Sequence, residues 1–282
     1  MTQDSCEQDR LDYAPCRYGG SRMVFRGPRR RLDQPYLAFI GGTETYGKFL
    51  ERPYPTMVEH ALDRPCINLG CVNGGIDAFV NDPALMEICH DAEMTVVQVM
   101  GANYLSNRFY SVHPRRNDRF VQASSVLQAI YGDVDFSDFT FVRHMLGDLH
   151  TTSPKRFETV VGEVREAWTA RMKNMLGQIG TRSILMWFSE EEVSDRHWSD
   201  RHAQLQVDPL FITKSMLNEL RPMVQDIVIV NPSRAALATG TAGMTFLPDQ
   251  ENAASELMGV ACHEEAADAI IATVQTMMRQ VA

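Results

Sequence analysis

YLAFIGGTETYG, residues 36–47, is the stretch of sequence that decides the expected fold. Apolar and aromatic residues run through its first part without interruption, as in a strand that is covered on both faces of a parallel sheet. Gly41 and Gly42 then let the backbone turn sharply and approach a ligand closely. Thr43 follows where a helix starts, at the positive end of the helix dipole. Because open α/β sheets bind ligands beyond the carboxyl ends of their strands, we expect the active site here.

Four more apolar segments along the chain have the character of strands, at residues 66–70, 95–103, 183–188 and 226–231. Segments with helical features separate them, at residues 48–62 in part, 76–92 with a break near Pro83, 120–131, 154–179, 209–220 and 264–280. Strands that alternate with helices in this way predict an α/β fold with a five-stranded parallel sheet and right-handed crossovers.

The chain divides into an arm and one domain with an insertion. Residues 1–35 carry few periodic apolar positions and several arginines, so we interpret them as an extended, solvated arm. An anion-binding arm and an arm exchanged between the subunits of a homo-oligomer are the alternatives. Residues 36–282 form the α/β domain, and residues 104–153 are interpreted as an inserted lid of helices and loops over the sheet.

The composition excludes several classes of protein. The 282 residues carry a formal net charge of -9, which argues against nucleic acid as a partner. No apolar run approaches the roughly 20 residues of a membrane span, and the polar first ten residues do not resemble a secretory signal. The six cysteines form no C-x-x-C pair, which argues for reduced thiols rather than a zinc site. We therefore expect a cytoplasmic protein without membrane contact.

Three of the predicted strands end in glycine turns that should meet at one edge of the sheet. Thr43 offers a hydroxyl there, the turn at Gly74 offers backbone N–H groups, and Asn103 offers an amide. His263 stands late in the chain, just before the last predicted helix. A hydroxyl, a histidine that removes its proton, and donors that stabilise an oxyanion are the parts of an acyl-transfer site.

This ordered set resembles the SGNH (GDSL-type) hydrolase superfamily. Residues 41–47 have the spacing of the G-D-S-x-x-x-G motif, and residues 68–70 are similar to N-x-G with a later glycine. Residues 101–103 match G-x-N, and His263 matches part of the last motif. The chain also resembles an alphaproteobacterial family through residues 113–120, and that resemblance implies no activity.

The SGNH resemblance implies a flavodoxin-like three-layer sandwich and an ester or acyl substrate of small-molecule or carbohydrate type. It implies no metal and no cofactor. By the matching positions, Thr43 would be the nucleophile or a substrate ligand and His263 the base. Oxyanion or substrate contacts would come from Gly42, Gly74 and Asn103.

Three departures from the SGNH pattern leave the activity open. Thr43 replaces the family's Ser, Gly42 replaces the Asp beside it, and Val260 stands where an Asp should precede the histidine. The alternatives are a binding protein on a degenerate hydrolase scaffold and a sulfo- or phosphotransferase. Thr43 could instead cap the helix, Gly74 and Asn103 could serve only the turns, and His263 could face solvent.

An arginine-rich segment follows the third predicted strand. A guanidinium fork suits carboxylate, sulfate or phosphate, so this segment is a candidate for holding an anionic part of the substrate, through Arg108, Arg115 and Arg116. Ion pairs with nearby acids are the equally weighted alternative. The loop with Asp195, His197, Asp200 and His202 lacks tight ligand spacing, so we favour a charged solvated loop over a metal site.

Overall fold

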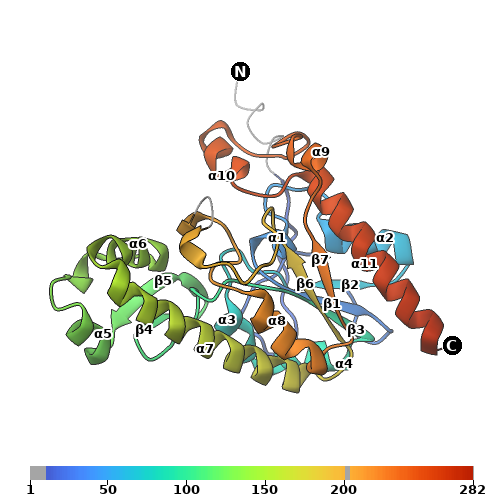
Figure 1. Cartoon of the computed structure of the whole chain (residues 1–282). Helices are drawn as coiled ribbons and strands as arrows, with labels where there is room; N and C mark the ends of the chain where they lie inside the picture. Colours follow the sequence, from blue (N-terminus) through green and yellow to red (C-terminus); the bar gives the residue numbers. More distant parts are fainter. Residues whose placement is uncertain (1–10, 201–203, 282) are drawn as a thin grey trace.

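The computed structural model describes residues 11–200 and 204–281. Its centre is a sheet in which the strands run in the order β2-β1-β3-β6-β7 and every pair is parallel. Figure 1 shows the sheet between two layers of helices. This is the flavodoxin-like three-layer arrangement, so the predicted fold class is confirmed. The strands are β1 (Leu37–Ile40), β2 (Cys66–Asn68), β3 (Met94–Gln98), β6 (Ser183–Phe188) and β7 (Asp226–Val230).

Different helices cover the two faces of the sheet. On one face α2 (Tyr54–Leu62) packs beside α11 (Val260–Val281) (Figure 1). The other face is covered by four helices, namely α3 (Ile76–Val80), α4 (Pro83–Asp91), α7 (Pro154–Ile179) and α8 (Lys214–Leu220). Pro83 begins α4, and Asp82 caps it, which explains the break that the sequence predicted near this proline.

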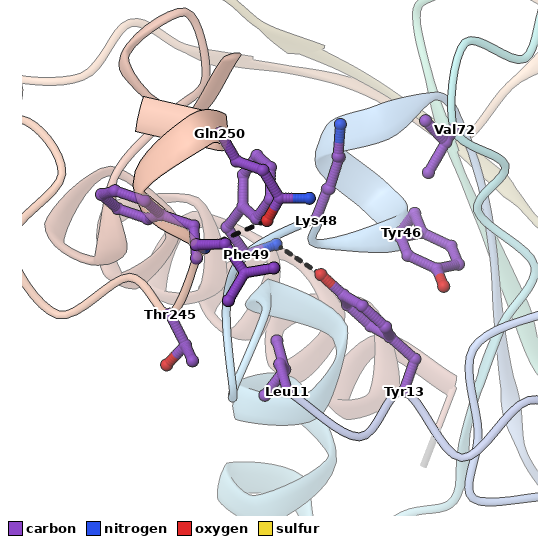
Figure 2. Close-up of a pocket in the computed structure, with 10 residues that line it drawn as sticks. Leu11, Tyr13, Tyr46, Lys48, Phe49, Val72, Thr245 and Gln250 are labelled. Carbon is purple, nitrogen blue, oxygen red and sulfur yellow. Dashed lines mark hydrogen bonds between the residues drawn. The ribbon is translucent and has the colours of Figure 1, made fainter. Parts of the chain in front are cut away.

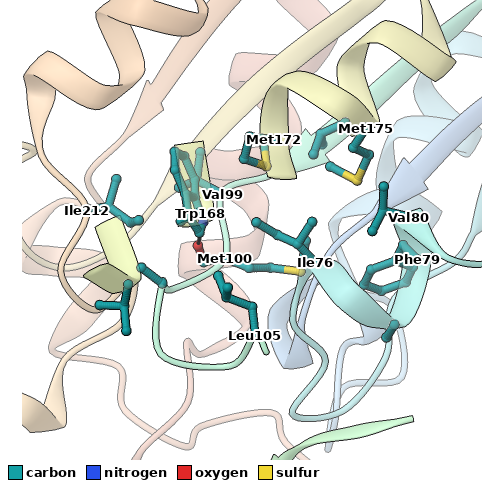
Figure 3. Packing of buried hydrophobic residues seen from close by; sticks show 14 of the residues in the cluster. Ile76, Phe79, Val80, Val99, Met100, Leu105, Trp168, Met172, Met175 and Ile212 are labelled. Atoms are coloured by element: carbon teal, nitrogen blue, oxygen red, sulfur yellow. Dashed lines mark hydrogen bonds between the residues drawn. The ribbon is translucent and has the colours of Figure 1, made fainter. Parts of the chain in front are cut away.

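The strands of the sheet are mostly apolar because alternate residues enter two separate cores. Leu37 and Phe39 of β1 join the core under α2 and α11, whereas Ala38 and Ile40 join the core under α3 and α7. Figure 3 shows the second core, where Trp168 and Met172 of α7 pack against α3. The buried indole of Trp168 donates a hydrogen bond to the carbonyl of Met100 at 2.8 Å. It ties the long helix to the segment after β3.

The insertion differs in part from the prediction. Residues 116–123 form the strand β5 (Arg116–Ala123), antiparallel to β4 (Tyr110–His113), where we predicted the start of a helix at Phe120. The helix α5 (Ser125–Ile130) begins only after Ser124, whose hydroxyl caps it. The predicted helix over 120–131 was therefore wrong in its first part. Hairpin pairing with Tyr110–His113 outweighed the helical preference that we had assigned to this segment. The helix α6 (Val142–Thr152) completes the insertion.

Several residues in the described part of the arm are packed against the domain, so our interpretation of the arm as solvated was wrong at these positions. Tyr18 and Phe25 are each 1% exposed. The guanidinium of Arg26 is buried and donates hydrogen bonds to the carbonyls of Gly47, Leu50 and Glu51 at 2.5–2.8 Å. The arm thus holds the loop that follows β1. Its arginines suggested solvent, but one of them satisfies buried backbone groups instead.

The remaining elements are short. They are the α-helices α1 (Thr43–Tyr46), α9 (Arg234–Leu237) and α10 (Glu251–Ser255), and the 3-10 helices η1 (Phe136–Asp138), η2 (Trp198–Asp200), η3 (Gln204–Gln206), η4 (Arg221–Met223) and η5 (Pro248–Gln250). Among the residues that the structure describes, none of these helices or the longer ones is both long and apolar enough to cross a membrane.

Candidate functional site at the carboxyl edge of the sheet

A buried glutamine organises the turn after β1. The side-chain oxygen Oε1 of Gln98, the last residue of β3, accepts hydrogen bonds from the Gly42 N–H at 3.1 Å and the Thr45 N–H at 3.2 Å. It also accepts one from the Thr45 hydroxyl at 2.6 Å. In this topology β1 and β3 flank the switch point of the sheet, where a ligand crevice is expected. The Gln98 side chain joins the ends of β1 and β3 at this point. The Gly42 N–H donates to Gln98 and is therefore not free to bind an oxyanion.

Thr43 faces the second glycine turn. The backbone N–H of Asn73 donates to its hydroxyl oxygen at 3.0 Å, and the amide Nδ2 of Asn73 donates to Asp118 at 3.2 Å. The Thr43 side chain does not cap α1, since Gly42 occupies the cap position without any side-chain bond. Thr43 is partly exposed and Asn73 is exposed, so both remain accessible.

Asn73 and Asp118 were not among the residues that we singled out for the site. Asn73 has a positive φ of 54°, a conformation that asparagine tolerates in turns, and it stands in a glycine-rich segment. The glycine-rich composition of that segment was the signal that could have identified Asn73 as a site residue. Asp118 comes from β5, which we had not predicted as a strand, so its approach to the turn could not be inferred.

His263 lies in the first turn of α11 and is completely buried. Its Nδ1 atom accepts a hydrogen bond from the Tyr54 N–H at 3.2 Å. The proton therefore sits on Nε2, which donates to the Glu44 carboxylate at 3.1 Å. The ring packs against the rings of Tyr54 and Phe188. Both nitrogens are occupied, and within residues 11–200 and 204–281 no hydrogen bond joins His263 to Thr43.

The other predicted oxyanion donors are also engaged or buried. The Gly74 N–H donates to the carbonyl of Cys71 at 2.9 Å. Asn103 is 0% exposed, and neither of its amide atoms has a hydrogen-bond partner among the residues that the structure describes. The hydrogen bonds thus do not favour the acyl-transfer roles that the resemblance implies for Gly42, Gly74 and His263. The buried, unpartnered amide of Asn103 is the one group of this set that could still donate.

An aromatic pocket of about 340 Å³ lies beside Tyr46 of α1 and beside the glycine-rich turn at Val72 (Figure 2). Tyr46, the last residue of α1, lines it together with Lys48 and Phe49 directly after α1, and Val72 lines it beside Asn73. The arm contributes Tyr13, whose hydroxyl accepts a hydrogen bond from the Phe49 N–H at 2.9 Å. Phe246 and Gln250 belong to the far wall, on the segment before α10.

The pocket combines an apolar lining with one cation. The ammonium of Lys48 lies 4.6 Å from the centre of the Phe49 ring and makes no ion pair with any described residue. Burial raises the pKa of the Tyr46 phenol, which keeps its hydroxyl neutral. Apolar walls with few polar groups are typical of small-molecule sites.

The three candidate arginines lie in different settings. The exposed guanidinium of Arg108 pairs with Glu163 and, at 3.7 Å, with Glu166 on α7, so it makes structural ion pairs. Arg115 and Arg116 are exposed, and their guanidinium groups have no partner among the described residues. None of the three lines the pocket at Lys48.

The charged loop after β6 carries ordinary polar contacts. His197 pairs with Glu158 at 3.0 Å, and the Asp195 carboxylate accepts a hydrogen bond from the Ser215 N–H at 2.7 Å. That hydrogen bond holds the pKa of Asp195 below its usual value. His202 and the Asp200 side chain lie outside the residues that can be described, so the structure says nothing of them.

The fold and the site define a flavodoxin-like α/β protein with a polar turn and an aromatic pocket beyond the carboxyl ends of β1 and β2. The chain belongs to the family described as Domain of unknown function (DUF6473), whose model matches residues 1–278. No curated protein and no solved structure matches the sequence.

Proposed function

We propose that this protein is a binding protein on a degenerate SGNH-type scaffold, which holds a small anionic metabolite with an apolar or acyl part. The observation that carries the proposal is the environment of His263. A nucleophilic hydroxyl needs a base within hydrogen-bond reach. His263 is buried with both ring nitrogens engaged by Tyr54 and Glu44. The Thr43 hydroxyl receives the Asn73 N–H instead.

The ligand chemistry follows from the pocket at Lys48. Its volume of about 340 Å³ and its lining of Tyr13, Tyr46, Phe49 and Phe246 suit a short acyl chain or an aromatic ring. The Lys48 ammonium suits a carboxylate at the end of that ligand. Thr43 and Asn73, in the adjoining turns, would bind polar groups of the ligand. The proposal includes a cytoplasmic location, which rests on the sequence alone.

Calorimetry with octanoate and phenylacetate as probes tests this proposal. Saturable binding by the wild type should weaken about tenfold in Lys48→Ala, because the carboxylate loses its charge partner. Arg52→Ala is the matched control, since Arg52 is exposed in the same loop and does not line the pocket. The proposal fails if neither probe binds, or if both variants weaken binding equally.

The second candidate is the SGNH-like hydrolase or acyltransferase. What favours it is that the Thr43 hydroxyl is partly exposed and has a backbone N–H within 3.0 Å. Hydrolysis of p-nitrophenyl esters and acetylated sugars distinguishes the two candidates. Turnover that disappears in Thr43→Ala and increases in Thr43→Ser would establish Thr43 as a nucleophile and overturn the binding proposal. If the wild type hydrolyses these esters no faster than Thr43→Ala does, the result supports the binding protein.

The third candidate, a sulfo- or phosphotransferase, requires an anion site. The two unpartnered guanidinium groups of Arg115 and Arg116 are the only observation in its favour among the residues discussed above, and neither lies at the pocket. It would be supported by calorimetric binding of adenosine phosphates that depends on Thr43.

A further inference from the structure

We propose that the protein has a second site, which binds the phosphate group of a small molecule in a groove separate from the Lys48 pocket. The groove has a volume of about 710 Å³. It lies between the arm at Arg22, the β4–β5 hairpin at His113 and Arg115, the α3–α4 segment at Asp77, and Arg171 of α7. It shares no lining residue with the pocket at Lys48, so this proposal does not rest on the function proposed above.

Two guanidinium groups in this groove are without partners. Arg22 comes from the arm and Arg115 from the hairpin turn, and both are exposed. Neither guanidinium makes an ion pair or hydrogen bond within the part of the chain that the structure describes. In a protein with a formal net charge of -9, two unpaired cations that line the same groove are a local excess of positive charge.

His113 adds a neutral donor beside them. Its Nδ1 atom accepts hydrogen bonds from the backbone N–H groups of Arg115 and Arg116, at 3.3 and 3.2 Å. The ring proton of the neutral imidazole must then sit on Nε2, which has no partner among the described residues. The same hydrogen bonds fix the hairpin turn, so the position of Arg115 depends on His113.

The carboxylates in the groove are already engaged. Asp77 is 7% exposed, accepts the Ser106 N–H at 2.8 Å, and pairs with Arg171 at 3.2 Å. Asp82 accepts the Ser21 hydroxyl at 2.7 Å and caps α4. Asp77 and Arg171 cancel each other's charge. The Asp82 charge is partly offset by its hydrogen bonds and the positive end of α4, so Arg22 and Arg115 keep the groove attractive to an anion.

A phosphate group fits this donor set best. Two guanidinium forks and an imidazole N–H offer donors from several directions, which suits a tetrahedral anion with two charges better than a single flat carboxylate. The volume exceeds what a bare phosphate needs, and it leaves room for an organic part along Asn81 and Ser106. Of the three arginines predicted to hold an anion, the structure brings only Arg115 into this groove.

Calorimetry with glycerol 3-phosphate, inorganic phosphate and citrate tests the proposal. Glycerol 3-phosphate should bind with an affinity that falls as salt rises, and Arg22→Ala or Arg115→Ala should each weaken it about tenfold. Arg116→Ala is the matched control, because Arg116 is the exposed neighbour of Arg115 and does not line the groove. A thermal melt of each variant shows that it is folded, which is expected of exposed side chains.

The ligands distinguish the source of the phosphate. Tighter binding of glycerol 3-phosphate than of inorganic phosphate identifies an organic phosphate as the ligand, whereas equal affinities identify free phosphate; both outcomes support the site. The proposal is overturned if neither phosphate binds, if citrate binds as tightly, or if Arg116→Ala weakens binding as much as Arg115→Ala. None of these results bears on the Lys48 pocket.

Discussion

The Nε2 atom of His263 donates to Glu44 at 3.1 Å, although the two residues are 219 positions apart in the chain. Glu44 directly follows Thr43, so the histidine faces the neighbour of the hydroxyl rather than the hydroxyl itself. The hydrogen bond joins the first turn of α11 to the short helix α1 after β1. Glu44 also accepts the N–H of Met258 at 3.3 Å. The pair therefore links the first and the last parts of the domain's sequence.

We expect His263→Ala to lower the free energy of unfolding by about 2–4 kcal/mol, because it removes a buried ring and leaves the Tyr54 N–H without its acceptor. Urea unfolding followed by circular dichroism measures the change. His60→Ala is the control, since His60 is exposed on α2, and its effect should stay within about 0.5 kcal/mol. Equal stability of the two variants would contradict a structural role for His263.

Gln98 holds the turn after β1, and Gln98→Leu keeps its approximate size while removing the acceptor. The N–H groups of Gly42 and Thr45 would then be buried without a partner. We expect a loss of about 2–4 kcal/mol in unfolding free energy, measured by chemical denaturation. Gln122→Leu, on the exposed side of β5, is the matched control and should have little effect. A similar loss in both variants would show that the leucine, rather than the missing acceptor, is responsible.

Arg26 connects the arm to the loop that lines the Lys48 pocket. Arg26→Ala leaves the carbonyls of Gly47, Leu50 and Glu51 without a donor, so we expect a loss of about 2–4 kcal/mol. Arg26→Lys keeps the positive charge but not the forked guanidinium, so its stability should lie between those of the wild type and Arg26→Ala. Thermal and urea unfolding measure these changes, with Arg52→Ala as an exposed control. If lysine restored full stability, the charge alone would be sufficient.

The Glu265 carboxylate near the start of α11 makes stability depend on pH. The hydroxyl of Ser233 donates to Glu265 at 2.6 Å and its N–H at 2.7 Å, which holds the pKa of Glu265 below its usual value. A lowered pKa in the folded state stabilises the protein above the unfolded pKa, and this stabilisation is lost as pH falls through the folded pKa.

Ser233→Ala should therefore cost stability near neutral pH, about 1 kcal/mol including the lost cap of α9, and less in acid, where Glu265 is protonated. Urea unfolding at several pH values measures the difference in stability between the wild type and Ser233→Ala, which should become smaller as the pH falls. Ser125→Ala, an exposed residue with no side-chain hydrogen bond to a described residue, should show no such trend. A difference that stays constant with pH would mean that only the cap matters.

Much of the fold was readable from the sequence because its signals are local. The predicted strand over 183–188 and the predicted helix over 154–179 agree with β6 and α7 at both ends. Ser153 caps that helix at its start, and Gly180 ends it with a φ of 89°. The order of apolar strands and helices likewise predicted the parallel sheet, since each crossover has one favoured hand.

For the site, the sequence predicted which edge of the sheet carries it, but not the contacts between its residues. The motif placed Thr43, the turn at Gly74 and Asn103 after successive strands, but not the partners of their polar groups. Around this edge Gln98 bonds to Gly42, Asp118 to Asn73 and Glu44 to His263. These are pairs of residues distant in the chain, which the packing of other elements brings together. The burial of the arm at Tyr18 has the same origin.

The sequence by itself determined the strands of the central sheet and the long helices beside it, because burial periodicity and caps act within a few residues of the chain. Only the tertiary structure decided which way His263 points and which arginines remain unpaired. Those outcomes depend on contacts between segments far apart in the chain. A side chain can form a hydrogen bond only with a group that folding brings within about 3 Å of it.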